Sequence, residues 1–299
     1  PRLPPTPSSA RPPRRRPRGP AAASIPGARA ASPAVSSDAT APTNAPTATV
    51  RLEQVSKRYG RKLAVHELSL DLYAGEVFAF LGPNGAGKTT TLKMTTGLLR
   101  PDTGRAVICG YDLAVSAREA KRVLAYVPDQ PFLYDKLTGR EFIHFARDMY
   151  GVDHAWAERC LDELTERLDM RPFLDNLTES YSHGMKQKVA LAAALVHDPT
   201  VLVVDEPIIG LDPRTIRVIK TIFRERAQRG GTVFMSTHTL DVAEAVADRI
   251  GIIHAGRLVA LGTLTELQSR AAPGSRLEDV FLHLPDGQGG TPRPDEAVA

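Results

Sequence analysis

The sequence predicts an α/β fold with a parallel sheet at its core. Two continuous apolar runs, Val77–Leu81 and Val201–Val204, have the length and composition of strands that are buried on both faces. A glycine-rich loop and a helical pattern follow the first run, and two acidic residues follow the second. Since parallel strands present their carboxyl ends at one edge of a sheet, we expect the functional side chains to gather at that edge.

The positive charge of the chain is concentrated in its first 48 residues. Hydrophobic residues make up 42% of the 299 residues and charged residues 24%, which is ordinary for a globular protein. Residues 1–48 contain 12 of the 24 prolines, and seven arginines against one aspartate. Such a segment cannot bury enough surface to offset its ordering entropy, so we predict a disordered tail, either solvated or in contact with anionic lipid. The remainder is nearly neutral, and no nucleic-acid partner is expected.

The two cysteines, Cys109 and Cys160, lie in unrelated contexts and indicate neither a disulfide framework nor a metal site. We expect both to be small core side chains. No apolar run approaches the roughly 18–20 residues that a membrane-spanning helix needs. We therefore predict a cytoplasmic protein that reaches the cytoplasmic face of the membrane only through a partner.

A phosphate-binding loop follows the first strand. Residues 82–89 match the pattern G-x-x-x-x-G-K-[ST] in full. The glycines let the backbone curl so that several N–H groups face phosphate oxygens, and the start of the helix adds positive potential. Lys88 can reach the β- and γ-phosphates, and the Thr89 hydroxyl can ligate Mg²⁺. The predicted ATP-binding residues of this loop are Gly82, Pro83, Asn84, Gly85, Ala86, Gly87, Lys88, Thr89 and Thr90.

Two further predicted strands are followed by polar residues. In "VLVVDEP", Asp205 is suited to holding Mg²⁺ through water, and Glu206 can orient and deprotonate an attacking water. The segment 230–246 predicts a strand that ends at Ser236-Thr237-His238, then an amphipathic helix, and a hairpin turned at Ala255-Gly256 follows. His238 can hydrogen-bond a γ-phosphate, or it can be a satisfied structural histidine.

A second anion-binding turn lies at "YSHGMKQK", residues 181–188. Ser182 is a plausible N-cap for a helix from about residue 183 to 197, which Pro199 ends. Gly184 permits close approach, and the free N–H groups at the helix start can bind a phosphate. Because the first loop already holds the nucleotide of this chain, the second turn can serve the nucleotide of another subunit.

Taken together, these motifs resemble those of ATP-binding subunits of ABC (ATP-binding cassette) transporters, over roughly residues 49–284. The phosphate loop, the signature at 181–185, the Asp205-Glu206 pair, "GLDP" at 210–213 and "STHTLDVAE" at 236–244 occur in the family order. The resemblance implies a P-loop NTPase core with a RecA-like parallel sheet, a small antiparallel β subdomain and an α-helical subdomain. It also implies ATP and Mg²⁺ as cofactors.

The resemblance also implies how these residues act. In the family, two subunits pack head to tail, and each signature closes over the ATP held by its partner, a second copy or a different ATPase subunit. Glu206 would be the catalytic base, and His238 would position γ-phosphate and water. Asp212 would couple the two sites across the dimer. Tyr59 would stack on adenine, with packing inside the small sheet as the alternative. The signature residues that would meet the partner's ATP are Ser182, His183, Gly184 and Met185.

Two motifs depart from the common family pattern. The signature reads Tyr-Ser-His-Gly-Met instead of Leu-Ser-Gly-Gly-Gln, so His183 is either an exposed spacer or a source of pH sensitivity. At residues 125–138 the family normally has Gln where Asp129 stands, to touch Mg²⁺ and relay motion to the membrane subunit. Either Asp129 replaces this Q-loop residue or Gln130 takes its place, and we favour Asp129, although a carboxylate offers no N–H donor to water.

The predicted domain organisation has three parts. Residues 1–48 form the tail, 49–285 the ABC ATPase domain, and 286–299 a flexible C-terminal tail. Segments near 49–56, 66–72 and 105–113 form the small antiparallel sheet, and a helical subdomain occupies about 135–185. The helical spacing of one face in this subdomain predicts core positions at Trp156, Cys160, Leu161, Leu164 and Leu168.

The function that these motifs favour is ATP hydrolysis that drives a separate integral membrane permease, in the direction of export. In the family, the helical subdomain and the Asp129 loop form the groove for a helix of that permease. The alternatives are a non-transport ABC ATPase that acts on the ribosome or DNA, and a regulatory module that closes on ATP without turnover. The intact Lys88, Asp205, Glu206 and His238 argue against the regulatory module.

Overall fold

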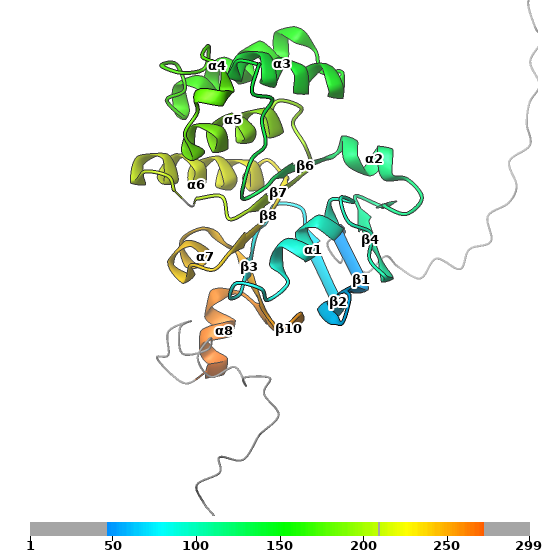
Figure 1. Cartoon of the computed structure of the whole chain (residues 1–299). Helices are drawn as coiled ribbons and strands as arrows, with labels where there is room; N and C mark the ends of the chain where they lie inside the picture. Colours follow the sequence, from blue (N-terminus) through cyan, green and yellow to red (C-terminus); the bar gives the residue numbers. More distant parts are fainter. Residues whose placement is uncertain (1–46, 209, 272–299) are drawn as a thin grey trace, which may run out of the picture. The chain divides into compact units, whose positions relative to one another are not determined.

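The computed structural model describes residues 47–208 and 210–271, and its core is a six-stranded sheet (Figure 1). The strand order is β10-β9-β3-β8-β7-β6, with all neighbours parallel except the β9–β10 hairpin. The strands are β3 (Val77–Leu81), β6 (Leu124–Val127), β7 (Val201–Asp205), β8 (Thr232–Thr237), β9 (Arg249–His254) and β10 (Arg257–Gly262). The hairpin turns at Ala255 and Gly256, as predicted, and both have positive φ. The predicted fold class is confirmed.

Alternation along the central strands divides the hydrophobic core into two layers. Val77, Ala79 and Leu81 face one cluster, which the α-helical part covers. Phe78 and Phe80 face the other cluster, between this sheet and the antiparallel sheet. All five residues of β3 are buried, which explains why the strand reads as a continuous apolar run.

The second sheet is antiparallel, with the order β2-β1-β4-β5. Its strands are β1 (Ala48–Tyr59), β2 (Lys62–Tyr73), β4 (Thr103–Ile108) and β5 (Tyr111–Asp112). The first two extend well past the predicted segments because they form one long hairpin, in which Tyr59 pairs with Lys62. β1 starts one residue before the predicted domain boundary at 49. The rest of the predicted N-terminal tail, residues 1–46, and the predicted tail 286–299 lie outside the described residues.

Helices cover both faces of the parallel sheet. α1 contacts strands of both sheets and lies between them, while α6 and α7 pack on the opposite face, against β3 and β8. These helices and their neighbours are α1 (Lys88–Thr95), α2 (Ala117–Arg122), α6 (Pro213–Gln228), α7 (Leu240–Val246) and α8 (Leu264–Ala271). No helix in the described part of the chain is long and apolar enough to cross a bilayer.

The helical subdomain stands above the β6 end of the sheet in Figure 1. It contains α3 (Gly139–Tyr150), α4 (His154–Arg167), the 3₁₀ turn η1 (Thr178–Ser180) and α5 (His183–Leu195). Thr138 and Glu141 form a capping box at the start of α3, and Gly151 ends that helix in the left-handed conformation. Asp153 then caps α4 by accepting a hydrogen bond from the N–H of Trp156.

Two of the predicted core positions are wrong. Cys160, Leu161, Leu164 and Leu168 are buried, but Trp156 is 37% exposed. Trp156 lies in the first turn of α4 at the mouth of a surface cavity, where its neighbours no longer cover it. Cys109 is only half-buried, because it occupies the left-handed turn between β4 and β5.

Candidate functional site

The loop between β3 and α1 is shaped by close backbone contacts. A Cβ atom on Gly82 would lie 2.4 Å from the carbonyl oxygen of Ile253, so no larger residue fits. Gly87 has φ of 111° and forms the N-cap of α1, and a Cβ there would lie 2.5 Å from the carbonyl oxygen of Ala64. The loop therefore packs tightly against β9 and β2. The N-terminus of α1 faces the concave inner side of this loop.

Lys88 spans this loop from the inside. Its side chain is only 7% exposed, and its ammonium group donates to the carbonyl oxygens of Gly82 at 2.7 Å and Pro83 at 3.3 Å. The same group lies 3.5 Å from Glu206 Oε1. Its charge therefore stands at the centre of the loop, where it can exchange these partners for phosphate oxygens.

The ends of β7 and β8 form the acidic side of the site. Asp205 is 1% exposed and accepts a hydrogen bond from the Ser236 hydroxyl, which lies opposite it in the pairing of the two strands. The backbone N–H of Glu206 donates to the Ser236 oxygen at 3.2 Å. Ser236 thus holds both acidic residues, a role that the sequence did not indicate. The signal in the sequence was that both strands end in polar residues, which meet when the two strands are neighbours in the sheet.

Glu206 occupies a restrained position. It adopts φ of 47°, a left-handed conformation that is uncommon for a residue with a side chain and recurs at functional sites. Its side chain is 11% exposed, and its Oε2 lies 3.0 Å from His238 Nδ1. The carboxylate is therefore fixed between Lys88 and His238.

A cavity of about 300 Å³ joins the loop to the other predicted nucleotide residues. It is lined by Tyr59, Lys62, Ala64, Asn84, Gly85, Gly87, Lys88, Thr89, Thr90, Asp129 and Glu206. Tyr59 ends β1 at its rim and is 50% exposed, so its ring is open to a ligand instead of packed within the small sheet. Lys62, which belongs to none of the sequence motifs, adds a second cation.

Asp129 lines the cavity, whereas Gln130 is exposed and does not line it. Burial raises the pKa of the Asp129 carboxyl, and the negative charges of Asp205 and Glu206 raise it further. A cation in this position would relieve that repulsion. Of the two candidates for the Q-loop residue, only Asp129 thus stands at the cavity.

The side chains around the loop fit Mg²⁺. Hard oxygen donors are what this ion prefers, and it usually takes one or two carboxylates together with substrate phosphates. The exposed Thr89, the buried Asp205 and Asp129 supply a hydroxyl and carboxylates near the loop. Within residues 47–208 and 210–271, no group of three or more His, Cys, Asp or Glu side chains is placed to hold a metal by itself.

The signature residues do not line this cavity. Ser182 caps α5 by accepting a hydrogen bond from the N–H of Met185 at 3.3 Å, and both Ser182 and His183 are exposed. Gly184 packs closely on the segment before α6, because a Cβ there would lie 3.3 Å from Leu211 Cδ2. The α5 N-terminus is thus formed and accessible, and His183 is close enough to Asp129 for its charge to act on that carboxyl, although no signature residue lines the cavity.

Asp212 has a local structural contact. It caps α6 by accepting hydrogen bonds from the N–H of Thr215 at 2.9 Å and from the Thr215 hydroxyl at 2.6 Å. These two bonds lower the pKa of its carboxyl. Asp212 is nevertheless exposed.

Comparison with known protein families identifies this arrangement. The family model described as ABC transporter matches residues 65–209. A linearmycin resistance ATP-binding protein of Bacillus subtilis is 37% identical over 221 residues, which are 74% of this chain and 71% of that protein. The chain belongs to the ABC transporter family. It is an ATP-binding subunit of that family, and its enzymatic activity is ATP hydrolysis.

Other members support the same assignment of this ABC subunit. A Nod factor export ATP-binding protein of Burkholderia lata is 39% identical, over 73% of this chain and 71% of that protein. A probable multidrug ABC transporter ATP-binding protein of Escherichia coli is 34% identical over 79% of this chain, but the match spans only 41% of that protein.

Solved structures show the same fold. An ATP-binding subunit of an ABC transporter superposes with a TM-score of 0.75 at 33% identity, covering 78% of this chain and 98% of that chain. A dimeric ATP-binding cassette bound to ADP and Pi gives a TM-score of 0.64 at 23% identity, over 72% of this chain and 98% of that one. The second likeness concerns the fold alone.

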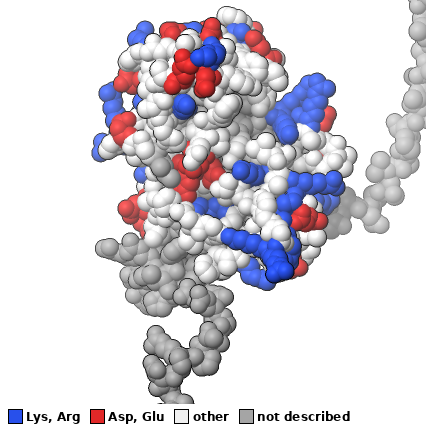
Figure 2. Space-filling view, in the orientation of Figure 1, with Lys and Arg blue, Asp and Glu red and all other residues white. Residues whose placement is uncertain are grey.

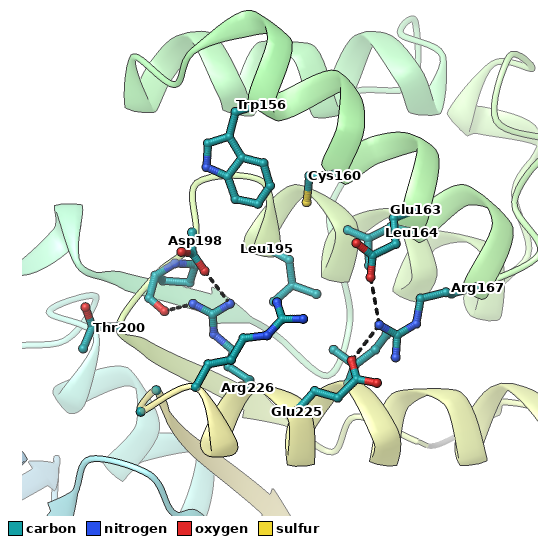
Figure 3. A pocket seen from close by; sticks show the side chains of 15 residues that line it. Trp156, Cys160, Glu163, Leu164, Arg167, Leu195, Asp198, Thr200, Glu225 and Arg226 are labelled. Atoms are coloured by element: carbon teal, nitrogen blue, oxygen red, sulfur yellow. Dashed lines mark hydrogen bonds and ion pairs between the residues drawn. The ribbon is translucent and has the colours of Figure 1, made fainter.

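The ABC subunit has a further cavity, of about 310 Å³, between α4 and α6 (Figure 3). Thr200 and Gly231, which line it, directly precede β7 and β8. The cavity therefore lies at the amino ends of these strands, whereas the phosphate loop lies at the carboxyl end of the sheet. Arg167 crosses it from α4 to α6, with its guanidinium 3.0 Å from Glu163 and 2.7 Å from Glu225. Most of the charged side chains around the cavity form ion pairs with one another. The pair of Arg167 and Glu225 joins α4 of the helical subdomain to α6.

Charge is unevenly distributed over the face shown in Figure 2. Lys and Arg side chains gather over the antiparallel sheet and α2, whereas the helical subdomain carries both signs. Exposed basic residues of the first region include Arg61, Lys62, Arg100, Lys121 and Arg122. This positive region borders the cavity through Lys62, so it favours the approach of an anionic nucleotide.

Proposed function

We propose that this subunit dimerises around two ATP molecules and hydrolyses them to drive a separate membrane permease, and that the permease is an exporter. The observation that carries the proposal is the placement of Glu206. Its carboxylate stands at the edge of the nucleotide cavity, 3.5 Å from Lys88 and 3.0 Å from His238.

This geometry assigns a task to each side chain. The loop N–H groups and Lys88 bind the phosphates and neutralise charge as it develops. One oxygen of Glu206 accepts a proton from the attacking water, while His238 holds the other oxygen and orients the γ-phosphate. Mg²⁺, held by Thr89, by Asp205 through water and by Asp129, would supply charge neutralisation on the phosphate oxygens.

The exposed signature supports a dimer. Ser182 and Gly184 stand at a formed helix N-terminus, and neither lines the nucleotide cavity of its own chain. A second subunit, in a head-to-tail arrangement, can bring its nucleotide to this terminus, and Asp212 beside it can couple the two sites. A structure of similar fold is itself dimeric.

An apolar groove supports the membrane partner. It has a volume of about 280 Å³ between β6, α3 and α5, and Phe132 and Met149 at its rim are 79% and 70% exposed. Large exposed apolar side chains around one hollow are typical of a protein-binding surface. We infer that a helix of the permease seats here, which places the subunit on the cytoplasmic face of the membrane.

The direction of transport rests on relatives. Those named above are a Nod factor export protein, a probable multidrug transporter protein and a linearmycin resistance protein. Their names favour export over action on the ribosome or DNA.

The test of the proposal begins with turnover by the full chain. Glu206→Gln should lose at least about 10² in kcat while ATP·Mg²⁺ converts the variant from monomer to dimer in light scattering. The matched control is Glu244→Gln, a change on the exposed face of α7 that should leave both properties unaltered. Equal turnover of wild type and Glu206→Gln would contradict the catalytic assignment.

The partner is tested by affinity capture of Glu206→Gln from gently solubilised native membranes in the presence of ATP. A polytopic membrane protein in stoichiometric yield would support the transporter. Ribosomal or DNA-associated proteins without a membrane protein would favour the non-transport alternative.

A further inference from the structure

Tyr181, the residue directly before the α5 N-cap, has a buried hydroxyl at the meeting point of several chain segments. Its side chain is 6% exposed, and its ring packs edge-on against Phe173, with 5.2 Å between ring centroids. The hydroxyl donates to the carbonyl oxygen of Phe173 at 2.8 Å, with those of Leu174 and Asn176 also in reach. It also accepts a hydrogen bond from the backbone N–H of Gly139 at 3.0 Å.

The contact with Gly139 connects two helices. Gly139 is the first residue of α3, and its N–H is one of the groups at a helix start that the helix itself cannot satisfy. A Cβ on Gly139 would lie 2.6 Å from the Tyr181 hydroxyl. A glycine here and a tyrosine 42 residues later are thus matched to one another. A leucine at position 181, as in the commonest signature, would have no group to accept this hydrogen bond.

Further contacts join residues 134–140, around the start of α3, to residues 174–178, which precede α5. The N–H of Thr178 donates to Leu137 O at 2.9 Å, and the Thr178 hydroxyl donates to Tyr134 O at 2.8 Å. Arg140 pairs with Asp175 at 2.7 Å. The two Thr178 contacts reach the segment before α3, whereas Arg140 lies in the first turn of α3 and its N–H also donates to Leu174 O at 3.0 Å. The bond from Tyr181 differs from these contacts because it reaches the same turn from the residue next to Ser182.

The two helices joined in this way face different partners. The start of α5 carries Ser182 and Gly184, which the proposed function assigns to the partner's nucleotide. The body of α3 forms a wall of the apolar groove through Phe142, Phe145 and Met149. The helices also pack on each other along their length, and the bond from Tyr181 adds a direct link from the residue before Ser182 to the first residue of α3.

We propose that Tyr181 is a positioning residue that transmits closure of the signature on ATP to α3, and thereby to the permease groove. This inference rests on the proposed function. When the α5 N-terminus closes on a phosphate, Tyr181 moves with it and holds the first turn of α3 in place. Without the hydroxyl, the signature still closes, but the first turn of α3 responds less.

The test is amide hydrogen exchange of the full chain in the Glu206→Gln background, with and without ATP·Mg²⁺. Two segments are compared, the signature at 181–187 and the start of α3 at 139–146. With Tyr181 present, ATP·Mg²⁺ should slow exchange in both segments by about tenfold. In Tyr181→Phe the signature should keep this response, while the response at 139–146 should fall below about twofold.

The matched control is Tyr134→Phe. Tyr134 lies on the same stretch of chain, is 49% exposed, and enters the network through its backbone carbonyl. It should therefore leave both responses intact. Gly139→Ala disturbs the same bond from the other helix, so it provides the same comparison if Tyr181→Phe does not fold.

The outcomes separate the two proposals. Equal responses at 139–146 in Tyr181→Phe and in the parent would overturn the inference and leave the proposed function standing. A parent that shows no response to ATP·Mg²⁺ at the signature would overturn the proposed dimer and this inference together.

Discussion

Glu206 and His238 are in direct contact across the ends of β7 and β8, with 3.0 Å between Oε2 and Nδ1. The two side chains differ in exposure, at 11% for Glu206 and 43% for His238. The carboxylate, mostly buried, is therefore in contact with a histidine that is still partly exposed to solvent. Lys88, 3.5 Å from the other oxygen, is the second charged neighbour of this carboxylate.

We predict that His238→Ala lowers kcat for ATP hydrolysis by about 10², with a smaller effect on KM, because Glu206 loses the contact that orients it. His238→Gln keeps a hydrogen-bond donor and should retain more turnover. The measurement is steady-state ATPase kinetics, with His254→Ala, in the β9–β10 hairpin, as the control. A kcat for His238→Ala equal to that of the control would show that the contact is merely structural.

Asp129 and Gln130 can be distinguished by their effect on the Mg²⁺ requirement. Asp129 lines the cavity near Asp205, so Asp129→Ala should raise the Mg²⁺ concentration for half-maximal turnover by about tenfold at fixed ATP. Gln130→Ala should leave this concentration unchanged, because its side chain points to solvent. The opposite pattern would assign the Q-loop role to Gln130.

Acid should destabilise the fold through His197. Its ring stacks on Tyr150, with 3.6 Å between centroids, and burial lowers the pKa of His197 to about 4 from 6.5, a shift that the charge of Arg226 reinforces. The unfolded chain therefore binds a proton at higher pH than the folded protein does. Stability from this group is complete above about pH 7 and falls as the pH drops toward 4, by up to about 3 kcal/mol.

The measurement for His197 is the free energy of unfolding between pH 8 and pH 4.5. His197→Phe keeps a ring against Tyr150 but removes the titration, so its stability should fall less steeply with acid than that of the wild type. His154→Asn, at a side chain that is 73% exposed, should follow the wild-type curve. Parallel curves for His197→Phe and the wild type would rule out this origin of acid sensitivity.

The ion pair between Arg167 and Glu225 should contribute to the attachment of the helical subdomain. Its atoms lie 2.7 Å apart in the cavity of Figure 3, with side-chain exposures of 25% and 36%. A double-mutant cycle with Arg167→Ala and Glu225→Ala should give a coupling energy of about 1 kcal/mol. The exposed pair Arg171–Glu166, at 76% and 64%, provides the control and should give a value near zero. Equal coupling in the two pairs would contradict the role of burial.

Local patterns in the chain were sufficient to predict most of the residues that the structure brings together at the candidate site. An apolar strand, a glycine-rich loop and a lysine at the start of a helix are neighbours in sequence, and their geometry follows from backbone rules that act over a few residues. For the same reason Ser182 could be predicted as a helix cap, and Ala255-Gly256 as a hairpin turn. The mispredicted Trp156 shows the limit, because helical spacing defines a face but not how far the neighbouring helices cover it.

Contacts between distant residues were decided only by the tertiary structure. Ser236 meets Asp205 because β7 and β8 pair in one register, and Tyr181 meets Gly139 because α3 packs on α5. The same packing chose Asp129 over Gln130 for the cavity. Sequence alone therefore determined the kind of chemistry and the elements that carry it. The partners of Glu206, Asp205 and Tyr181 depend on strand order and helix packing, which arise from burial of the whole core and not from any single segment.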